Sequence, residues 1–105
     1  MITEDRAEKS LRYLAETDEP CAAAKANMER AEFKAKAIRQ ATFMHMSGTV
    51  AERQALSDVG EDYAEAMTFY FDAIKEYSHM ANKRETERIV LDCWRSIQAN
   101  RRAGQ

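Results

Sequence analysis

Residues 61–102 contain no glycine and no proline, and this stretch constrains the fold more than any other feature of the sequence. Nothing in it interrupts a helix, so we expect one helix of about 40 residues and about 60 Å. One stripe along this helix has tyrosines in its first half and arginines in its second half. At about 100° per residue, the stripe stays within a sector of about 60°. Its members are Tyr63, Tyr70, Tyr77, Arg84, Arg88, Arg95 and Arg102.

Two interpretations of this Tyr/Arg stripe are open. In a single-stranded nucleic-acid binder, the tyrosines would stack on bases and the arginines would neutralise phosphates. In a purely structural role, the tyrosines would edge the core and the arginines would pair with neighbours such as Glu85 and Glu87. Under the first interpretation, the binding residues are Tyr70, Tyr77, Arg84, Arg88, Arg95 and Arg102.

The N-terminal half predicts two further helices, at about 3–16 and 19–46. Asp18 is a good N-cap and Pro20 is tolerated in a first turn, so we expect a break before residue 19. The second of these helices has a heptad seam of small residues that faces the long helix. It also carries a second apolar stripe, which needs another neighbour, either the first helix or another subunit. This stripe consists of Phe33, Ala37, Ala41 and Met44.

The segment between the two long helices predicts a structured tip. Gly48 suits the left-handed position after a helix, and Thr49 with Glu52 matches a capping box that opens a short helix at 50–56. We therefore expect an all-α fold: a long antiparallel α-hairpin with a short N-terminal helix and a short helix at its tip. Residues 1–105 would form a single helical domain.

A protein interface and self-association follow from the apolar patterns. Trp94, the only tryptophan, lies in an apolar patch of the long helix that faces Leu11 and Leu14 or an external partner. Because a two-helix hairpin buries little apolar surface, we expect at least a dimer. The predicted interface residues are Phe33, Ala37, Ala41, Met44 and Trp94.

The composition agrees with a helical protein and excludes several classes of function. Apolar residues make up 45% of the chain, and only three glycines are present to build turns or cradle a phosphate. The net charge of −2 gives no global basic excess of the kind that marks an obligate nucleic-acid binder. No apolar run approaches a membrane span and no secretory leader is recognisable, so we expect a cytoplasmic protein without membrane contact.

Residues that could carry chemistry are scarce. Neither His45 nor His79 has a metal-ligating residue three or four positions later on its helix. Cys21 and Cys93 lack Cys-x-x-Cys spacing, which predicts two buried free thiols. We therefore expect no enzyme, no metal and no cofactor.

Five pieces of the chain resemble a family of small helical proteins of tailed bacteriophages and prophages. The resemblance implies a phage origin and an accessory role near replication and recombination, in the cytoplasm of the bacterial host. It assigns a function to no residue. The pieces are residues 14–19 (LAETDE), 29–37 (ERAEFKAKA), 48–55 (GTVAERQA), 82–87 (NKRETE) and 94–102 (WRSIQANRR).

These observations give two hypotheses from different classes. The first is a non-enzymatic, oligomeric accessory protein that binds a phage or host protein of DNA replication or recombination. The second is a protein that binds single-stranded nucleic acid directly through the Tyr/Arg stripe. Burial of the tyrosines in the hairpin seam would remove the stacking platform that the second hypothesis needs.

Overall fold

The computed structural model describes residues 1–104, which form three helices and no strand. Helix α1 spans Glu4–His45, α2 spans Val50–Asp58 and α3 spans Glu61–Ala103. The prediction of an all-α hairpin with a short helix at its tip is confirmed, and the long helix matches the predicted 61–102 within one residue.

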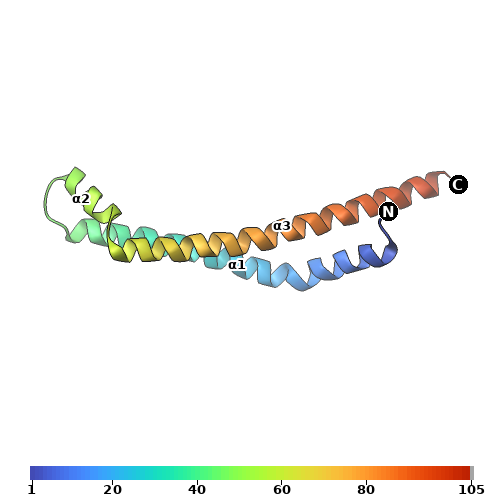
Figure 1. The fold of residues 1–105 in the computed structure, drawn as a ribbon, viewed down its shortest axis with the longest axis horizontal. Helices are drawn as coiled ribbons and strands as arrows, with labels where there is room; N and C mark the ends of the chain where they lie inside the picture. Colours follow the sequence, from blue (N-terminus) through green and yellow to red (C-terminus); the bar gives the residue numbers. More distant parts are fainter. Residues whose placement is uncertain (105) are drawn as a thin grey trace. The chain divides into compact units, whose positions relative to one another are not determined.

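The chain divides into two compact units, and both long helices contribute to each. Unit 1 comprises Met1–Ala22 and Ser78–Gln105, and unit 2 comprises Ala23–Tyr77. Within each unit α1 and α3 lie side by side and antiparallel, and α2 belongs to unit 2 (Figure 1).

The predicted break between residues 16 and 19 was wrong, because α1 continues through Pro20. Pro20 withholds one N–H from the carbonyl of Glu16, but both residues are exposed, so water can satisfy that carbonyl. The seam also stays in phase through the proline, which keeps both ends of α1 packed on α3. Its positions recur at alternating spacings of three and four: Ala7, Ser10, Leu14, Thr17, Cys21, Ala24, Met28, Ala31 and Ala35.

The helix ends follow the predicted capping chemistry. The Thr3 hydroxyl accepts a hydrogen bond from the Arg6 N–H at 3.1 Å, and Thr49 accepts from the Glu52 N–H at 3.2 Å. Gly48 has a φ of 120°, a backbone conformation that other residues rarely adopt. A Cβ at Gly48 would lie 2.6 Å from Glu52 Oε2, but that carboxylate can move, so the backbone conformation is the reason for glycine there.

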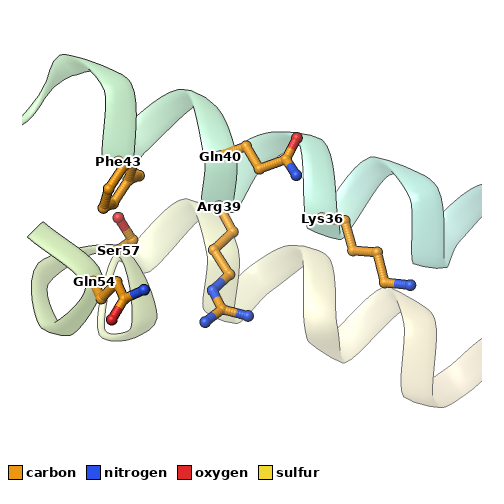
Figure 2. A pocket seen from close by; sticks show the side chains of 6 residues that line it. All are labelled: Lys36, Arg39, Gln40, Phe43, Gln54 and Ser57. Atoms are coloured by element: carbon orange, nitrogen blue, oxygen red, sulfur yellow. The ribbon is translucent and has the colours of Figure 1, made fainter. Parts of the chain in front are cut away.

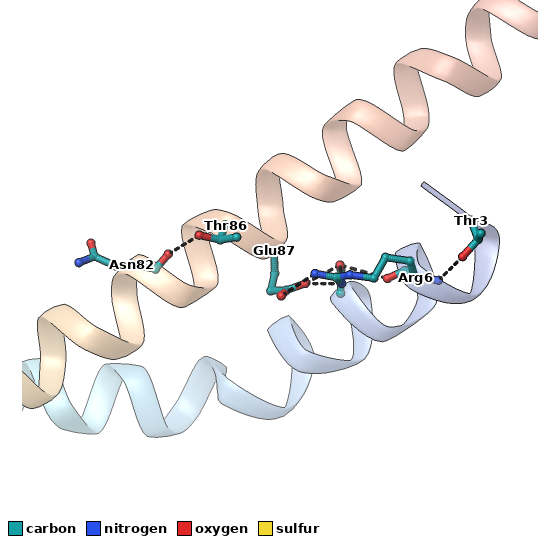
Figure 3. Close-up of polar contacts among 6 residues, drawn as sticks. Thr3, Arg6, Asn82, Thr86 and Glu87 are labelled. Atoms are coloured by element: carbon teal, nitrogen blue, oxygen red, sulfur yellow. Dashed lines mark hydrogen bonds and ion pairs between the residues drawn. The ribbon is translucent and has the colours of Figure 1, made fainter. Parts of the chain in front are cut away.

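In unit 1 a polar network joins α1 to α3 (Figure 3). Arg6 donates to both carboxylate oxygens of Glu87, at 2.7 and 2.9 Å. The hydroxyl of Ser10, which is fully buried, donates to Glu87 Oε2 at 2.6 Å. Together these donors hold the pKa of Glu87 at about 2, well below its usual 4.5, with the Arg6 hydrogen bonds as the largest cause.

One turn away, Arg84 forms a second polar link within unit 1. Its guanidinium donates to the carbonyl of Leu14 at 2.7 Å and to the hydroxyl of Thr17 at 2.6 Å. The Thr17 hydroxyl in turn donates a hydrogen bond to the carbonyl of Tyr13 at 2.6 Å. The polar positions of the unit 1 seam are therefore paired with one another across the two helices.

The unit 2 seam consists instead of alanines flanked by half-buried tyrosines. Ala35 is 1% exposed, which agrees with a seam of small residues that faces another helix. On the facing helix Ala66 and Ala73 are 6% and 5% exposed. The tyrosines of the predicted stripe, Tyr63, Tyr70 and Tyr77, border these alanines and are half-buried.

The two cysteines are free, as expected, but the prediction that both are buried was wrong. Cys93 is exposed and Cys21 is half-buried. Cys21 occupies a seam position of α1 near the end of the first segment of unit 1.

Candidate functional site

The predicted apolar stripe on α1 lies on the surface of unit 2. Phe33 and Met44 are each 75% exposed, and Ala37 and Ala41 between them are also exposed. At about 100° per residue, Phe33, Ala37 and Met44 point within about 20° of the direction opposite the buried Ala35. These four residues are called the outer face of α1 below.

No part of α1 can cover this outer face. The sequence left two neighbours open for it, the first helix or another subunit. Because residues 4–45 form one helix, its N-terminal part continues the same rod and cannot fold back over the face. The first helix is therefore ruled out as the neighbour of this face, and another subunit stays a prediction.

Exposed apolar side chains are concentrated in unit 2, especially around α2. Met46, Val50, Leu56 and Val59 at the tip are between 40% and 76% exposed. The sequence predicted a structured tip at residues 47–60 but not this apolar cluster. By contrast, the exposed large apolar side chains of unit 1 are Met1, Leu11 and Ile89.

A hollow of about 330 Å³ opens between α1 and α2 of unit 2 (Figure 2). Its cationic groups are already paired, with Lys36 Nζ 2.9 Å from Glu32 and Arg39 Nε 2.8 Å from Asp58. The first pairing raises the pKa of Lys36 and lowers that of Glu32. Figure 2 shows Phe43 pointing toward Gln54 and Ser57. The hollow therefore presents apolar stems and carboxamides rather than free charge.

The predicted nucleic-acid residues divide between the two units. Tyr70 and Tyr77 belong to unit 2, where they are half-buried, and the four arginines belong to unit 1. Arg84 is occupied by the backbone and Thr17 of α1. Glu85 accepts hydrogen bonds from Arg88 at 2.6 to 3.0 Å, and these hydrogen bonds raise the pKa of Arg88. The two stripe residues with the freest guanidinium groups are Arg95, whose nearest carboxylate is Asp92 at 3.8 Å, and the exposed Arg102.

Trp94 lies beside these last two arginines in unit 1. Trp94, Arg95, Gln98 and Arg102 line one hollow of about 330 Å³ on α3. The indole Nε1 is buried and has no hydrogen-bond partner within residues 1–104. The structure thus brings together Trp94, predicted as a protein contact, with two residues predicted to contact phosphates.

Groups with the geometry for catalysis or metal binding are scarce among residues 1–104. In the described part of the chain no group of three or more His, Cys, Asp and Glu side chains is placed to hold a metal ion. The buried hydroxyl of Ser57 donates to the Arg53 carbonyl at 2.8 Å, which ties it to the backbone of its own helix.

None of the helices described is both long and apolar enough to cross a membrane.

Comparison with protein-family models, curated proteins and solved structures gave no match to this chain. The resemblance to bacteriophage proteins therefore stays a prediction.

Proposed function

We propose that this chain is a non-enzymatic, oligomeric interaction protein whose contact surface is the outer face of α1. One observation carries the proposal: Phe33 and Met44 are each 75% exposed on the same face of α1, which is one continuous helix. Exposed apolar groups gathered on one face mark interaction sites far more often than scattered ones do.

The small core of the chain supports assembly with another molecule. Alanine contributes little burial, so a seam of alanines gives limited hydrophobic stabilisation. The chain exposes 7947 Å² of surface. A compact monomer of 12.0 kDa would expose roughly 6,000 Å². Apart from Leu91, the buried apolar residues in the described part are Ala7, Ala24, Ala35, Ala66 and Ala73.

The excess surface is enough to supply an interface. A stable protein–protein contact needs about 800 Å² from each partner. Contact through the outer face would cover Phe33 and Met44 and would leave the hairpin seam undisturbed.

The resemblance to phage proteins suggests what the assembly acts on. We propose a phage or host protein of DNA replication or recombination as its target, in the cytoplasm of the bacterial host. Affinity capture from infected host lysate, with and without nuclease, tests this part. A target that persists after nuclease treatment supports direct protein contact, and capture that disappears with nuclease contradicts it.

Sedimentation velocity at several micromolar concentrations tests the contact surface itself. The parent protein should sediment as a dimer or larger, and Phe33→Ser with Met44→Ser should sediment as a monomer of unchanged helix content. Ile89→Ser is the matched control, because Ile89 is 52% exposed but belongs to unit 1. A parent protein that stays monomeric throughout contradicts the proposal.

Single-stranded nucleic-acid binding is the second candidate, supported by the shared hollow of Trp94, Arg95 and Arg102. If both arginines contact phosphates, replacing both with alanine should lower the salt slope of binding by about 1.4. Arg88→Ala is the control, since Glu85 already pairs with Arg88. Fluorescence anisotropy of a labelled oligonucleotide measures the slope. Absence of binding by the parent protein at about 50 mM salt removes this candidate.

A further inference from the structure

We propose that the occupant of the outer face of α1 is a second copy of the chain, paired antiparallel about a two-fold axis near residue 39. In this arrangement Phe33 of each copy packs against Met44 of the other. The inference rests on the proposed function, and it adds the identity of the partner, the direction of pairing and the register.

The order of side chains along the outer face is self-complementary. Large side chains stand at its two ends, Phe33 and Met44, and small ones, Ala37 and Ala41, stand between them. An antiparallel copy with Phe33 opposite Met44 also places Ala37 opposite Ala41 within one residue. The helices can then approach closely at the centre while the two large pairs fill the ends. A surface that is complementary to itself across a two-fold axis forms a dimer and no larger assembly through that contact.

Charge favours the antiparallel direction over the parallel one. Arg30 and Lys34 flank the outer face, are exposed, and form no ion pair within residues 1–104. In a parallel pair, each of these cations would lie beside the same residue of the other copy, and like charges would repel. An antiparallel pair instead moves Arg30 close to residues 44–47 of the other copy, at the C-terminal end of α1. A helix C-terminus carries negative potential, so the cation is stabilised there.

The acceptors at that end of α1 are available. The Phe43 carbonyl accepts from Arg53 Nε at 3.2 Å and the Thr42 carbonyl accepts from the Met46 N–H at 3.1 Å. The carbonyls of Met44 and His45 accept no hydrogen bond from the described residues. Arg30 of the second copy can donate to them. The exposed Met46 and Val50 would widen the same contact beyond the end of the helix.

Spin-label distances measure the pairing direction without altering the outer face. Cys21 and Cys93 are first replaced with alanine, and one label is attached at Lys25→Cys, an exposed position of unit 2 outside the face. In the antiparallel register the two labelled positions are about 27 residues apart along the paired helices, or about 40 Å. In a parallel pair they would lie about 10 Å apart, the spacing of neighbouring helices. Pulsed electron resonance separates these two distances.

Disulfide cross-linking then tests the register. One copy carries Phe33→Cys and the other, of different mass, carries Met44→Cys, both without the native cysteines. We expect the mixed disulfide to exceed either same-residue disulfide by about tenfold. Same-residue positions lie about 16 Å apart in the proposed pair, beyond the roughly 7 Å limit for a disulfide.

The outcomes distinguish this inference from the proposed function. An assembled protein with a label distance of about 10 Å, or with same-residue disulfides dominant, overturns the antiparallel pairing but leaves the contact surface in place. Assembly that Phe33→Ser with Met44→Ser does not disturb overturns both. A monomeric parent protein also overturns both.

Discussion

The two units are built from the same pair of helices but are held together by different chemistry. Unit 1 joins α1 and α3 through the network of Arg6, Ser10 and Glu87, with Arg84 bound to the α1 backbone one turn away. Unit 2 joins them through alanines such as Ala35 and Ala73. Some large apolar side chains of unit 2, such as Phe33 and Met44, lie on its surface instead of in its core.

The contrast separates two tasks that one helical hairpin must perform. A seam of alanines permits close approach, but neighbouring registers differ little in packing because the residues are alike. Directional hydrogen bonds between Glu87 and two different α1 side chains accept one register only. Unit 1 therefore fixes how the helices align, and this leaves unit 2 free to expose apolar groups for a partner.

Of the changes that test this difference between the units, removal of Glu87 should lower the stability most. Glu87→Ala removes the carboxylate that accepts from the fully buried Ser10 and from Arg6, and leaves these two residues only their hydrogen bonds with each other. We expect a loss of about 3 kcal/mol in the free energy of unfolding, measured by urea titration. Glu85→Ala is the control, because Glu85 pairs with Arg88 on the exposed side of the same helix. Equal losses for the two variants would show that the network does not stabilise unit 1.

Acid should weaken the same network without any mutation. The folded pKa of Glu87 is about 2, below the usual 4.5. The unfolded chain therefore binds the proton more readily, so the stability from ionised Glu87 is complete above pH 4.5 and is lost as the pH falls toward 2. Thermal unfolding between pH 7 and pH 2.5 measures this loss. Glu87→Gln should show a flatter decline, and a slope identical to that of the parent would contradict the assignment.

In unit 2 the test is overpacking of the alanine seam. Ala35→Leu inserts a larger side chain where 1% of the residue is exposed, and should cost about 2 kcal/mol. Ala23→Leu is the control, since Ala23 belongs to the same unit but is exposed. Melting temperatures compare the two variants. An unchanged value for Ala35→Leu would mean that α3 can move away from the seam at little cost.

Spacing and capping rules predicted most of the fold. The run without glycine or proline gave α3 almost to the residue, and Gly48 and Thr49 marked helix ends correctly. The predicted break at Pro20 was wrong because the preference of proline for the first turn of a helix was weighted above the heptad pattern of the seam. Ser10, Thr17 and Cys21 are not strongly apolar, so the heptad that continues through the proline was not recognised.

The polar network could have been found by the same extension of the heptad. On α3 the seven-residue series places Arg84 and Glu87 at seam positions, facing Ser10 and Thr17 of α1. Which α1 residue each of them faces depends on how the two antiparallel helices are aligned. The residue spacing within one helix does not give that alignment. The stripe with Phe33 and Met44 was predicted to contact either the first helix or another subunit, and the continuity of α1 removes the first of these.

Removal of the two helix caps should have the smallest effect on stability. Thr3 caps the 42-residue α1, and Thr49 caps the nine-residue α2. Removing either cap should cost about 1 kcal/mol in its own helix. A helix as short as α2 is marginal by itself, so Thr49→Ala should lower the protection of the α2 amides against hydrogen exchange.

The long α1 should respond differently, because its later turns remain packed on α3. Thr3→Ala should therefore raise hydrogen exchange only in the first turn of α1, while Thr49→Ser, which keeps the capping hydroxyl, should leave α2 protected. Hydrogen exchange followed by mass spectrometry resolves both segments. If Thr49→Ala leaves α2 as protected as in the parent protein, α2 is held by its contacts with α1, such as Arg53 with Phe43 and Asp58 with Arg39. The exposed apolar groups of the tip would then sit on a rigid surface, which favours a partner that binds without reshaping it.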